Sequence, residues 1–391
     1  MQKNTILIDY DKIIHESKII LKEYDLCDYC LGRFFVKNTN TSSSKRLGNK
    51  IKNSINSRTP IKCSLCKNLF SSLDFYAKTM QDISSDYEFS TFSVGAILKQ
   101  SIIERDDKMR SKFNLRGVDS IKTEITKELR NKFTRKTKAK IDHITPDLTF
   151  IINFRTEQCH VKTKSLFLYG RYLKNKRGLP QKQKTCQDCK GKGCIFCNNH
   201  GIVSFNSIEG KISQFLYKKF ETNQVNFTWI GGEDKTGLVR GNGRPFFAKL
   251  ISPKKRNIRL PKKSDLDEII IHDLRIIDHI PSGSIPFKTR IKLFIITQKN
   301  ITSEKLRKLK QLVGIIINYY PTNSKNSKKV IHMLKYTKKS SKSFIIQIEA
   351  DGGLPIKHLV DGLHVNPNVS DLLGIKCFCE KFDVYQITLS K

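Results

Sequence analysis

The apolar residues in the first half of the chain recur at the spacings of helices and strands. One series is separated by steps of four and falls on one helix face: Ile121, Ile125, Leu129 and Phe133. Two more runs have helical spacing, and two are short and apolar like strands. We expect helices over residues 12–22 and 69–80 and strands over residues 148–154 and 166–169. This mixture is typical of α+β proteins.

Longer apolar runs dominate the chain after residue 205. They predict strands over residues 268–278, 291–297, 314–320, 344–349 and 382–388. A helix is expected between two of them, over residues 303–313. Strands that alternate with helices in this irregular order predict a mixed or antiparallel sheet flanked by helices. We therefore assign the chain to the α+β class.

A glycine-rich loop places Asp234 between two apolar runs, residues 225–230 and 245–250. The loop begins Gly-Gly-Glu-Asp-Lys-Thr-Gly at residue 231. Glycines permit close approach of the backbone to a ligand, and a carboxylate on such a turn can act as a nucleophile or base. The alternative is an ordinary hairpin loop with a solvated Glu-Asp pair, because glycine-rich loops are common.

The charge of the chain favours a polyanionic partner. Its 391 residues include 72 Lys and Arg against 36 Asp and Glu, a formal net charge of +36. Nucleic acid is the usual partner of so basic a protein. Three basic segments suit phosphate contacts: residues 130–140, 170–181 and a predicted hairpin at 323–343. Solvated surface, or a lysine-rich proteome encoded by an AT-biased genome, is the competing interpretation of this charge.

No apolar run approaches the length that spans a bilayer, and the N-terminus, Met-Gln-Lys-Asn-Thr, shows no signal-peptide pattern. We expect a cytoplasmic protein that does not enter a membrane.

Eight of the eleven cysteines form Cys-x-x-Cys pairs. The first set of four is Cys27, Cys30, Cys63 and Cys66, and the second is Cys186, Cys189, Cys194 and Cys197. Four thiolates brought together by short turns suit one tetrahedral zinc ion, so the sequence predicts one or two structural zinc sites. A disulfide framework is disfavoured in a cytosolic chain, and unrelated free thiols are the other alternative. The remaining cysteines, at 159, 377 and 379, are expected to pack in the interior.

The Gly-Gly-Glu-Asp loop and the Gly-Asn-Gly-Arg-Pro-Phe that follows it resemble the catalytic signature of the archaeal and eukaryotic tRNA pseudouridine(54/55) synthases. Further segments resemble landmarks of that family, in family order: Cys-Asp-Tyr-Cys-Leu-Gly-Arg-Phe-Phe at 27–35, Phe-Ser-Val-Gly at 92–95, Tyr-Gly-Arg-Tyr at 169–172, Arg-Gly-Leu-Pro-Gln at 177–181 and Glu-Ala-Asp-Gly-Gly-Leu-Pro-Ile-Lys-His-Leu at 349–359. The resemblance covers nearly the whole chain.

The resemblance implies three domains. They are an N-terminal zinc-bearing lobe over residues 1–80, a THUMP-like RNA-binding domain with the second cysteine set over residues 81–200, and a pseudouridine synthase domain over residues 201–391. It also implies an isomerase that converts uridine to pseudouridine at position 54, position 55 or both in the TΨC arm of tRNA. We expect tRNA as partner, a monomeric chain, and no catalytic cofactor beside the structural zinc.

Individual roles follow from the same resemblance. Asp234 matches the catalytic aspartate and Lys357 the basic residue that pairs with it. The expected substrate contacts are an apolar residue below the base, phosphate-holding arginines, and the position of the base-stacking tyrosine. Leu359 is expected below the base, and Ile291 stands at the position of the base-stacking tyrosine. The phosphate-holding arginines are expected to be Arg244, Arg171 and Arg177.

The chain departs from the family pattern at several positions. Gly232 and Leu238 stand where arginines are usual, and Pro355 and Ile291 stand where tyrosines are usual. Three tyrosines further along are candidates for the missing stacking ring: Tyr319, Tyr320 and Tyr336. These losses leave a second interpretation open, a non-catalytic RNA-binding or tRNA chaperone protein on the same scaffold. A zinc-ribbon DNA-binding factor would explain the charge and the cysteines but not the glycine-rich loop.

Overall fold

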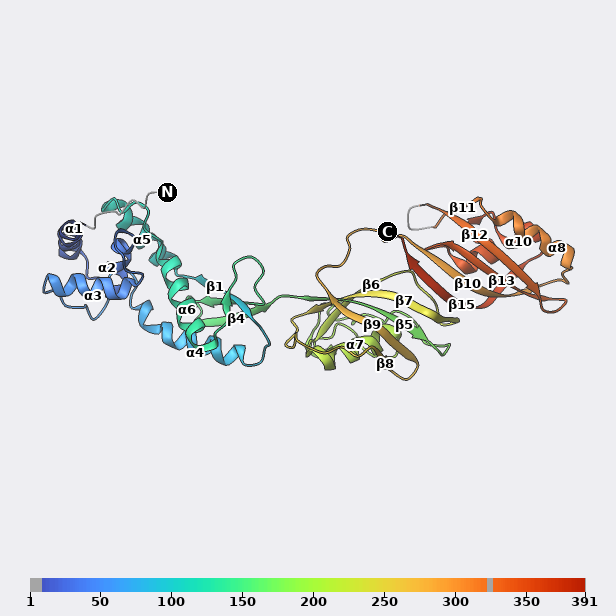
Figure 1. Cartoon of the computed structure of the whole chain (residues 1–391), viewed down its shortest axis with the longest axis horizontal. Helices are drawn as coiled ribbons and strands as arrows, with labels where there is room; N and C mark the ends of the chain where they lie inside the picture. Colours follow the sequence, from blue (N-terminus) through green and yellow to red (C-terminus); the bar gives the residue numbers. More distant parts are fainter. Residues whose placement is uncertain (1–8, 322–325, 391) are drawn as a thin grey trace. The chain divides into compact units, whose positions relative to one another are not determined.

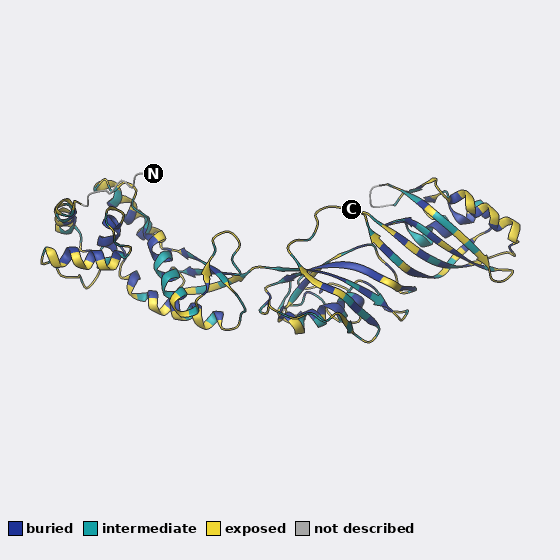
Figure 2. Ribbon diagram, in the orientation of Figure 1, coloured by how far each residue is buried: buried dark blue, intermediate teal, exposed yellow. Residues whose placement is uncertain are grey.

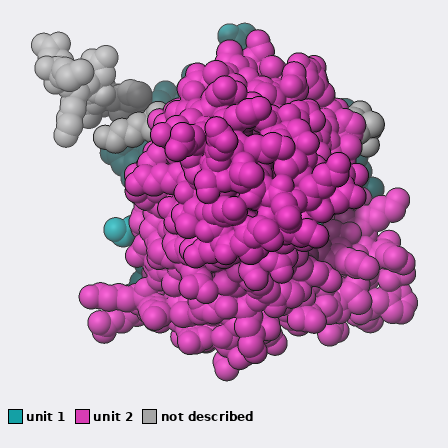
Figure 3. All heavy atoms as spheres, turned by 90° about the vertical axis from the view of Figure 1, so that its right-hand side faces the viewer, with its two compact units in different colours: residues 1–164 teal, residues 165–391 magenta. Residues whose placement is uncertain are grey.

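The computed structural model describes residues 9–321 and 326–390. The chain divides into two compact units, Met1–Lys164 and Ser165–Lys391, which are coloured separately in Figure 3. This division differs from the expected boundaries at residues 80 and 200. A helix runs across residue 80, and a strand that begins at residue 166 pairs inside the second unit. The second cysteine set therefore lies in the second unit, because it follows that strand.

Unit 1 packs helices against a small sheet (Figure 1). Its helices are α1 (Tyr10–Glu23), α2 (Asp28–Phe35), α3 (Ser44–Ser54), α4 (Leu73–Ser84), α5 (Gln100–Lys112) and α6 (Ile121–Thr137), with short 3-10 turns η1 (Val36–Asn38) and η2 (Leu69–Ser72). Its strands are β1 (Thr91–Ile97), β2 (Lys140–Ile141), β3 (Leu148–Asn153) and β4 (Gln158–Thr163). Among the described residues the strand order is β2-β1-β3-β4, with β1 parallel to both neighbours and β3 antiparallel to β4.

The predicted apolar helix face is present in α6. The Ser120 side chain accepts a hydrogen bond from the Thr123 amide at its start, and Lys138 ends the helix in a left-handed conformation. Three residues of the predicted series have no exposed surface: Ile125, Leu129 and Phe133. The helices expected at 12–22 and 69–80 are also confirmed, as α1 and as η2 with α4.

Unit 2 is built on one mixed sheet. Its strands are β5 (Leu166–Lys174), β6 (Gln224–Trp229), β7 (Gly237–Ile251), β8 (Lys263–Asp265), β9 (Ile269–Ile277), β10 (Phe287–Thr297), β11 (Ile316–Tyr319), β12 (Ser327–Lys338), β13 (Ser343–Asp351), β14 (Val365–Asn366) and β15 (Cys377–Leu389). Over the part of the chain that is described, the strand order is β14-β11-β12-β13-β10-β15-β7-β5-β9-β8, and β6 also pairs with β7. The strands predicted after residue 205 are all present, and the basic segment 326–343 forms β12 and the turn into β13. Residues 323–325 of that segment lie outside the described residues.

Two helix-covered cores stabilise the two halves of this sheet. Helix α7 (Ile208–Phe220) packs on β5, β7 and β9, and the 3-10 turn η3 (Ile195–Cys197) precedes it. The other half carries α8 (Ser303–Arg307), η4 (Lys308–Leu312), α9 (Ile356–Asp361) and α10 (Val369–Leu373). Dark blue residues mark both cores in Figure 2. The halves meet where β7 and β15 run side by side in parallel, with Phe382 opposite Gly237. This junction positions the loop between β6 and β7, which carries Asp234.

Candidate active site

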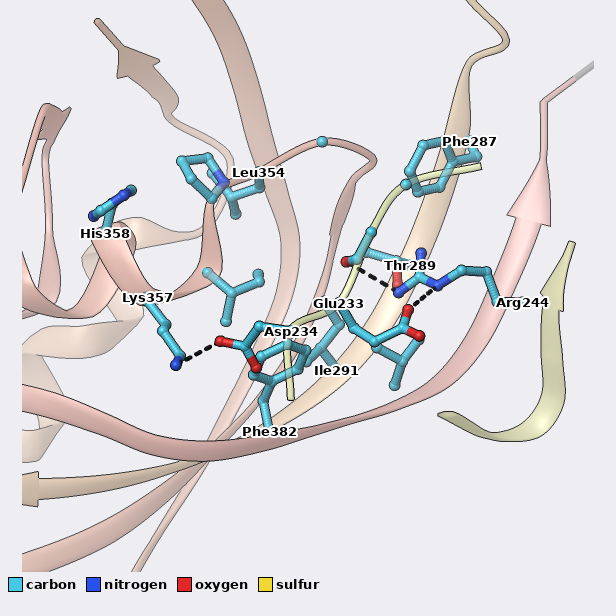
Figure 4. Close-up of a pocket in the computed structure, with 16 residues that line it drawn as sticks. Glu233, Asp234, Arg244, Phe287, Thr289, Ile291, Leu354, Lys357, His358 and Phe382 are labelled. Atoms are coloured by element: carbon cyan, nitrogen blue, oxygen red, sulfur yellow. Dashed lines mark hydrogen bonds and ion pairs between the residues drawn. The ribbon is translucent and has the colours of Figure 1, made fainter. Parts of the chain in front are cut away.

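A pocket of about 410 Å³ opens at the loop between β6 and β7. It is lined by Gly231, Gly232, Glu233, Asp234, Arg244, Phe287, Thr289, Ile291, Gly353, Leu354, Pro355, Ile356, Lys357, His358, Phe382 and Val384. Figure 4 shows the two charged residues Asp234 and Lys357 directed toward each other, with Phe287 well away from them. The lining comes from both halves of the sheet, so the pocket exists only when the two halves are joined.

Asp234 and Lys357 form an ion pair at this pocket, with 2.5 Å between the Lys357 Nζ and an Asp234 Oδ. The other Asp234 oxygen accepts hydrogen bonds from the Thr236 amide at 2.7 Å and from its hydroxyl at 2.6 Å. Partial burial acts to raise the Asp234 pKa, but the hydrogen bonds from Lys357 and Thr236 outweigh it, so the pKa lies below its ordinary value. About two-fifths of each side chain is exposed, which leaves the pair accessible to a ligand.

A buried charge pair supports the loop from behind. The Arg244 Nε lies 2.6 Å from a carboxylate oxygen of Glu233, and these side chains are 4% and 0% exposed. The second Glu233 oxygen accepts a hydrogen bond from the Tyr172 hydroxyl at 2.6 Å. Gln181 donates in turn to that hydroxyl at 2.9 Å. A buried carboxylate is costly unless it is paired and hydrogen-bonded, and Glu233 has both kinds of partner.

Two further cations hold the main chain of the loop. Lys174 is completely buried and its Nζ donates to the Asp234 carbonyl oxygen at 2.9 Å. Burial lowers the Lys174 pKa, and the nearby carboxylates of Glu233 and Asp234 act in the opposite direction. Arg177 donates to the Thr236 carbonyl and forms an ion pair with Asp383 on β15. The Asp234 side chain therefore projects from a loop whose own backbone is fixed on both sides.

Apolar side chains form the walls around the charged pair. Ile291 and Phe382 lie on neighbouring strands, and Leu354 and Ile356 precede or begin α9. Phe287 closes one side, where its ring is held between two glycines. A Cβ atom on Gly352 would lie 2.4 Å from the ring, and one on Gly231 would lie 2.8 Å from it. The arrangement offers an ionised carboxylate beneath a slot suited to a flat, partly apolar ring.

The structure places four of the expected substrate contacts elsewhere. Arg244 was expected to hold a phosphate, but it is 3% exposed, forms the ion pair with Glu233 and donates to the carbonyls of Ile230 and Gly232. Leu359 lies on α9, is 2% exposed in the core and is not part of the pocket lining.

Arg171 and Arg177 lie in unit 2 rather than in an RNA-binding domain of unit 1. Arg171 donates to the carbonyls of Asn242, Gly243 and Ile387, and so ties β7 to β15. Arg177 is engaged with the loop and with β15, as described above. Backbone carbonyls engage both guanidinium groups, and a carboxylate also engages that of Arg177.

Ile291 does line the pocket, at the position expected for the stacking tyrosine. None of the three candidate replacement tyrosines is part of the described lining. Tyr319 instead stacks on His358, a lining residue, with ring centroids 6.4 Å apart. The aromatic rings that the lining does contain are Phe287, Phe382 and the imidazole of His358.

Sequence reasoning missed the residues that support the loop. Tyr172, Lys174 and Gln181 belong to the segment interpreted from the sequence as a basic RNA contact. Their partners, Glu233 and Asp234, lie about sixty positions further along the chain. One signal was present: a lysine and a tyrosine two residues apart on a strand share one face of the sheet.

Two models of known protein families match this chain. The family model described as Pus10, C-terminal, matches residues 167–388, more than half of the chain. The model described as Pus10 THUMP domain, archaeal, matches residues 76–153. The chain belongs to the Pus10 family.

Two similar members of the Pus10 family come from Nitrosopumilus maritimus and Cenarchaeum symbiosum. The chain is 45% identical over 378 residues to the protein named tRNA pseudouridine synthase Pus10 of Nitrosopumilus maritimus. That alignment covers 97% of this chain and 98% of the relative. It is 34% identical over 368 residues to the protein of the same name from Cenarchaeum symbiosum, covering 94% and 91%. The relatives therefore align with both units of this Pus10-family chain.

The eight paired cysteines gather in the two predicted sets of four. Within each set the sulfur atoms all lie within 4.8 Å of one another. Individual pairs are 3.7 Å apart for Cys27 and Cys66 and 3.9 Å for Cys186 and Cys194. Four sulfurs placed about 2.3 Å from a central ion at tetrahedral angles are about 3.8 Å apart. Both sets therefore fit a tetrahedral metal ion.

The second set also has amide groups directed at its sulfurs. Cys197 Sγ accepts from the amides of Cys194 and Gly201, each at 3.2 Å, and Cys189 Sγ accepts from the Gly193 amide at 3.2 Å. Donors of this kind stabilise thiolates that bind a metal.

Over residues 9–321 and 326–390, no helix is long and apolar enough to cross a membrane.

The buried pair makes a prediction for Arg244. In Arg244→Met, Glu233 loses its cation, so we expect the loop to become less stable by about 3–5 kcal/mol. Hydrogen exchange of residues 231–236 should speed up, while the salt dependence of RNA binding stays unchanged. The double variant Glu233→Gln with Arg244→Met removes both charges and should recover much of the protection. A salt slope reduced by about one unit in the single variant would show instead that Arg244 contacts a phosphate.

Proposed function

We propose that this chain converts uridine to pseudouridine at position 54, position 55 or both in the TΨC arm of tRNA, with Asp234 as the nucleophile. The activity class, an isomerase that makes pseudouridine in tRNA, follows from membership of the Pus10 family. The observation that carries the proposal is the Asp234 and Lys357 ion pair, 2.5 Å long, exposed in a pocket with apolar walls. The tRNA positions and the individual roles rest on the resemblance and on this geometry.

The target uridine must leave its stack before it can reach Asp234. In the pocket, the ionised carboxylate attacks the nucleoside while the bond between C1′ and N1 breaks. The detached uracil anion turns, and C5 bonds to C1′ as the bond between C1′ and the Asp234 carboxylate breaks. C5 then loses its proton and N1 gains one. Atoms and electrons balance within the nucleoside, so the reaction is an isomerisation.

Lys357 and Thr236 keep the nucleophile charged and aimed. Their hydrogen bonds hold the Asp234 pKa below its ordinary value despite partial burial. Because Thr236 engages one oxygen and Lys357 the other, the carboxylate has a fixed orientation. We assign Lys357 to orientation of Asp234 and to the stability of its charge.

The apolar walls would hold the flat base once it has left the stack. Ile291 and Phe382 present aliphatic and aromatic surfaces close to Asp234, and Leu354 faces the same space (Figure 4). An isoleucine can pack on a base without the ring stacking that a tyrosine provides. We propose that Phe382 or Phe287 supplies the aromatic surface that Ile291 lacks. The intact ion pair of Asp234 and Lys357 favours a catalytic protein over the non-catalytic alternative.

We also propose that both cysteine sets hold zinc in a structural role. Cys63 and Cys66 come from a loop before α4, and Cys27 and Cys30 flank the start of α2, so one ion would join these two segments. The second set would close the long connection between β5 and α7. Four thiolates fill a tetrahedral zinc site, which leaves no position for substrate.

The nucleophile prediction uses an isosteric change. Asp234→Asn keeps the size of the side chain but removes its charge, so pseudouridine formation should fall by at least about a thousandfold. The affinity for tRNA should stay within a few fold. Tritium release from C5-labelled uridine measures the first quantity and filter binding the second. Asp361→Asn, a nearby carboxylate outside the pocket lining, is the control and should retain activity. Wild-type turnover by Asp234→Asn would overturn the role of Asp234.

A pH prediction follows from the Lys357 interaction. In Lys357→Met the burial that raises the Asp234 pKa is no longer opposed by the ammonium group. The Asp234 pKa should therefore rise, and the acidic limb of the rate profile should move to higher pH. The loss of pseudouridine formation relative to wild type should be larger at pH 5 than at pH 8. Lys376→Met removes an exposed lysine and should leave the acidic limb at the pH of the wild type. If the acidic limb of Lys357→Met also stays at the wild-type pH, the assignment of Lys357 is contradicted.

Metal content tests the zinc proposal. Protein purified without chelators should carry close to two zinc ions per chain by elemental analysis. Cys63→Ser should lose one ion and unfold unit 1 while hydrogen exchange of the Asp234 loop in unit 2 is unchanged, because the units have separate cores. Cys189→Ser should lose the other ion. A content near zero in wild-type protein is the result that would sink this proposal.

A further inference from the structure

A second pocket adjoins the first, and we propose that it binds the nucleotide next to the target uridine in the RNA chain. This inference rests on the proposed function, since it assumes an RNA target in the first pocket. The second pocket has a volume of about 520 Å³. It is lined by Thr228, Trp229, Ile230, Gly231, Gly283, Ser284, Ile285, Pro286, Phe287, Lys288, Lys329, Asp351, Gly352, Gly353 and Ser390.

The two pockets share a wall. Gly231, Phe287 and Gly353 line both of them. The Phe287 ring is the bulk of this wall, and the absence of side chains at Gly231 and Gly352 gives it room. Phe287 is therefore placed to separate two consecutive bases, one in each pocket.

The second pocket also has the charge that a phosphate requires. Lys288 and Lys329 lie in its lining, and within the described residues neither forms an ion pair. Among the described residues of the lining, Asp351 is the only carboxylate, and it is already engaged. One of its oxygens lies 2.8 Å from His332 and the other accepts from the Val330 amide at 2.9 Å. The two ammonium groups are thus available for a phosphate.

The lining of the second pocket also contains aromatic and apolar residues. Trp229 is half-buried, stacks on Phe227 with ring centroids 4.9 Å apart, and meets Tyr172 edge-on. Ile285 and Pro286 add aliphatic surface. Basic groups beside a fixed aromatic platform are the combination that holds single-stranded RNA without reading its sequence. An acidic peptide would use the lysines but leave this platform unoccupied, so a nucleotide fits better.

The test uses the full chain and a T-arm stem-loop RNA with an abasic residue immediately 5′ or 3′ of the target. Trp229 is the only tryptophan of the sequence, so its fluorescence reports on this pocket. We expect intact RNA to quench it. One of the two abasic RNAs should fail to quench it and should bind about 5- to 100-fold more weakly, as expected for one lost stacking contact. The position of that abasic residue identifies which neighbour occupies the pocket.

Variants separate this site from general charge effects. In Trp229→Leu, which keeps an apolar side chain, the affinity difference between intact and abasic RNA should shrink to less than twofold. Lys329→Gln should lower the salt slope of binding by about one unit. Lys335→Gln removes an exposed lysine of β12 outside the lining and should preserve the full difference between intact and abasic RNA. Thermal unfolding of each variant verifies that it folds. If Trp229→Leu does not fold, the salt slope of Lys329→Gln tests the proposal by itself.

Two results would overturn the proposal: equal affinity of wild-type protein for intact and both abasic RNAs, or an undiminished difference in Trp229→Leu. These measurements require binding alone. Pseudouridine formation in the intact stem-loop is scored separately, so its absence counts against the proposed function and not against the second pocket.

Discussion

The parallel contact between β7 and β15 is the constraint on which the site depends. It is short, with Phe382, Asp383 and Val384 opposite Gly237, Leu238 and Val239. Each half of the sheet has its own helices and its own core, but neither half contains the whole pocket. Asp234 follows β6 on one side of the junction, and Lys357 begins α9 on the other. The ion pair between them can form only if this register is maintained.

Two arginines reinforce the junction where strand pairing alone is weak. Arg171 reaches from β5 to the Ile387 carbonyl, and Arg177 reaches from the following segment to Asp383. Hydrogen bonds to charged groups are among the stronger ones in proteins, and a planar guanidinium can serve several acceptors at once. The same residues looked like phosphate contacts in the sequence. In the structure they hold the half of the sheet that carries Asp234 against the half that carries Lys357.

Local patterns were sufficient to predict much of the fold. Helix periodicity located α6, short apolar runs located the strands of unit 2, and Cys-x-x-Cys spacing grouped the thiols correctly. Asp234 and Lys357 were identified through sequence segments that resemble a family, and the structure brings them together. Their catalytic roles stay predictions.

The failures share one physical cause. Whether an arginine faces solvent or lies buried depends on partners that are far away in sequence, as Glu233 and Asp383 show for Arg244 and Arg177. Composition gives no information about such pairs. The boundary at residue 200 failed for a related reason, because β5 is separated by a long cysteine-bearing connection from the strands with which it pairs.

The late position of β15 in the sequence has a consequence for synthesis of the protein. Unit 1 has a continuous core of its own and can fold while the rest of the chain is still being made. The pocket cannot form at that stage, because Phe382 and Val384 are part of its wall and Asp383 forms an ion pair with Arg177. Until residues 377–389 have left the ribosome, β7 and β10 lack the strand that lies between them. A nascent chain therefore carries its folded N-terminal unit before it has a complete pocket at Asp234.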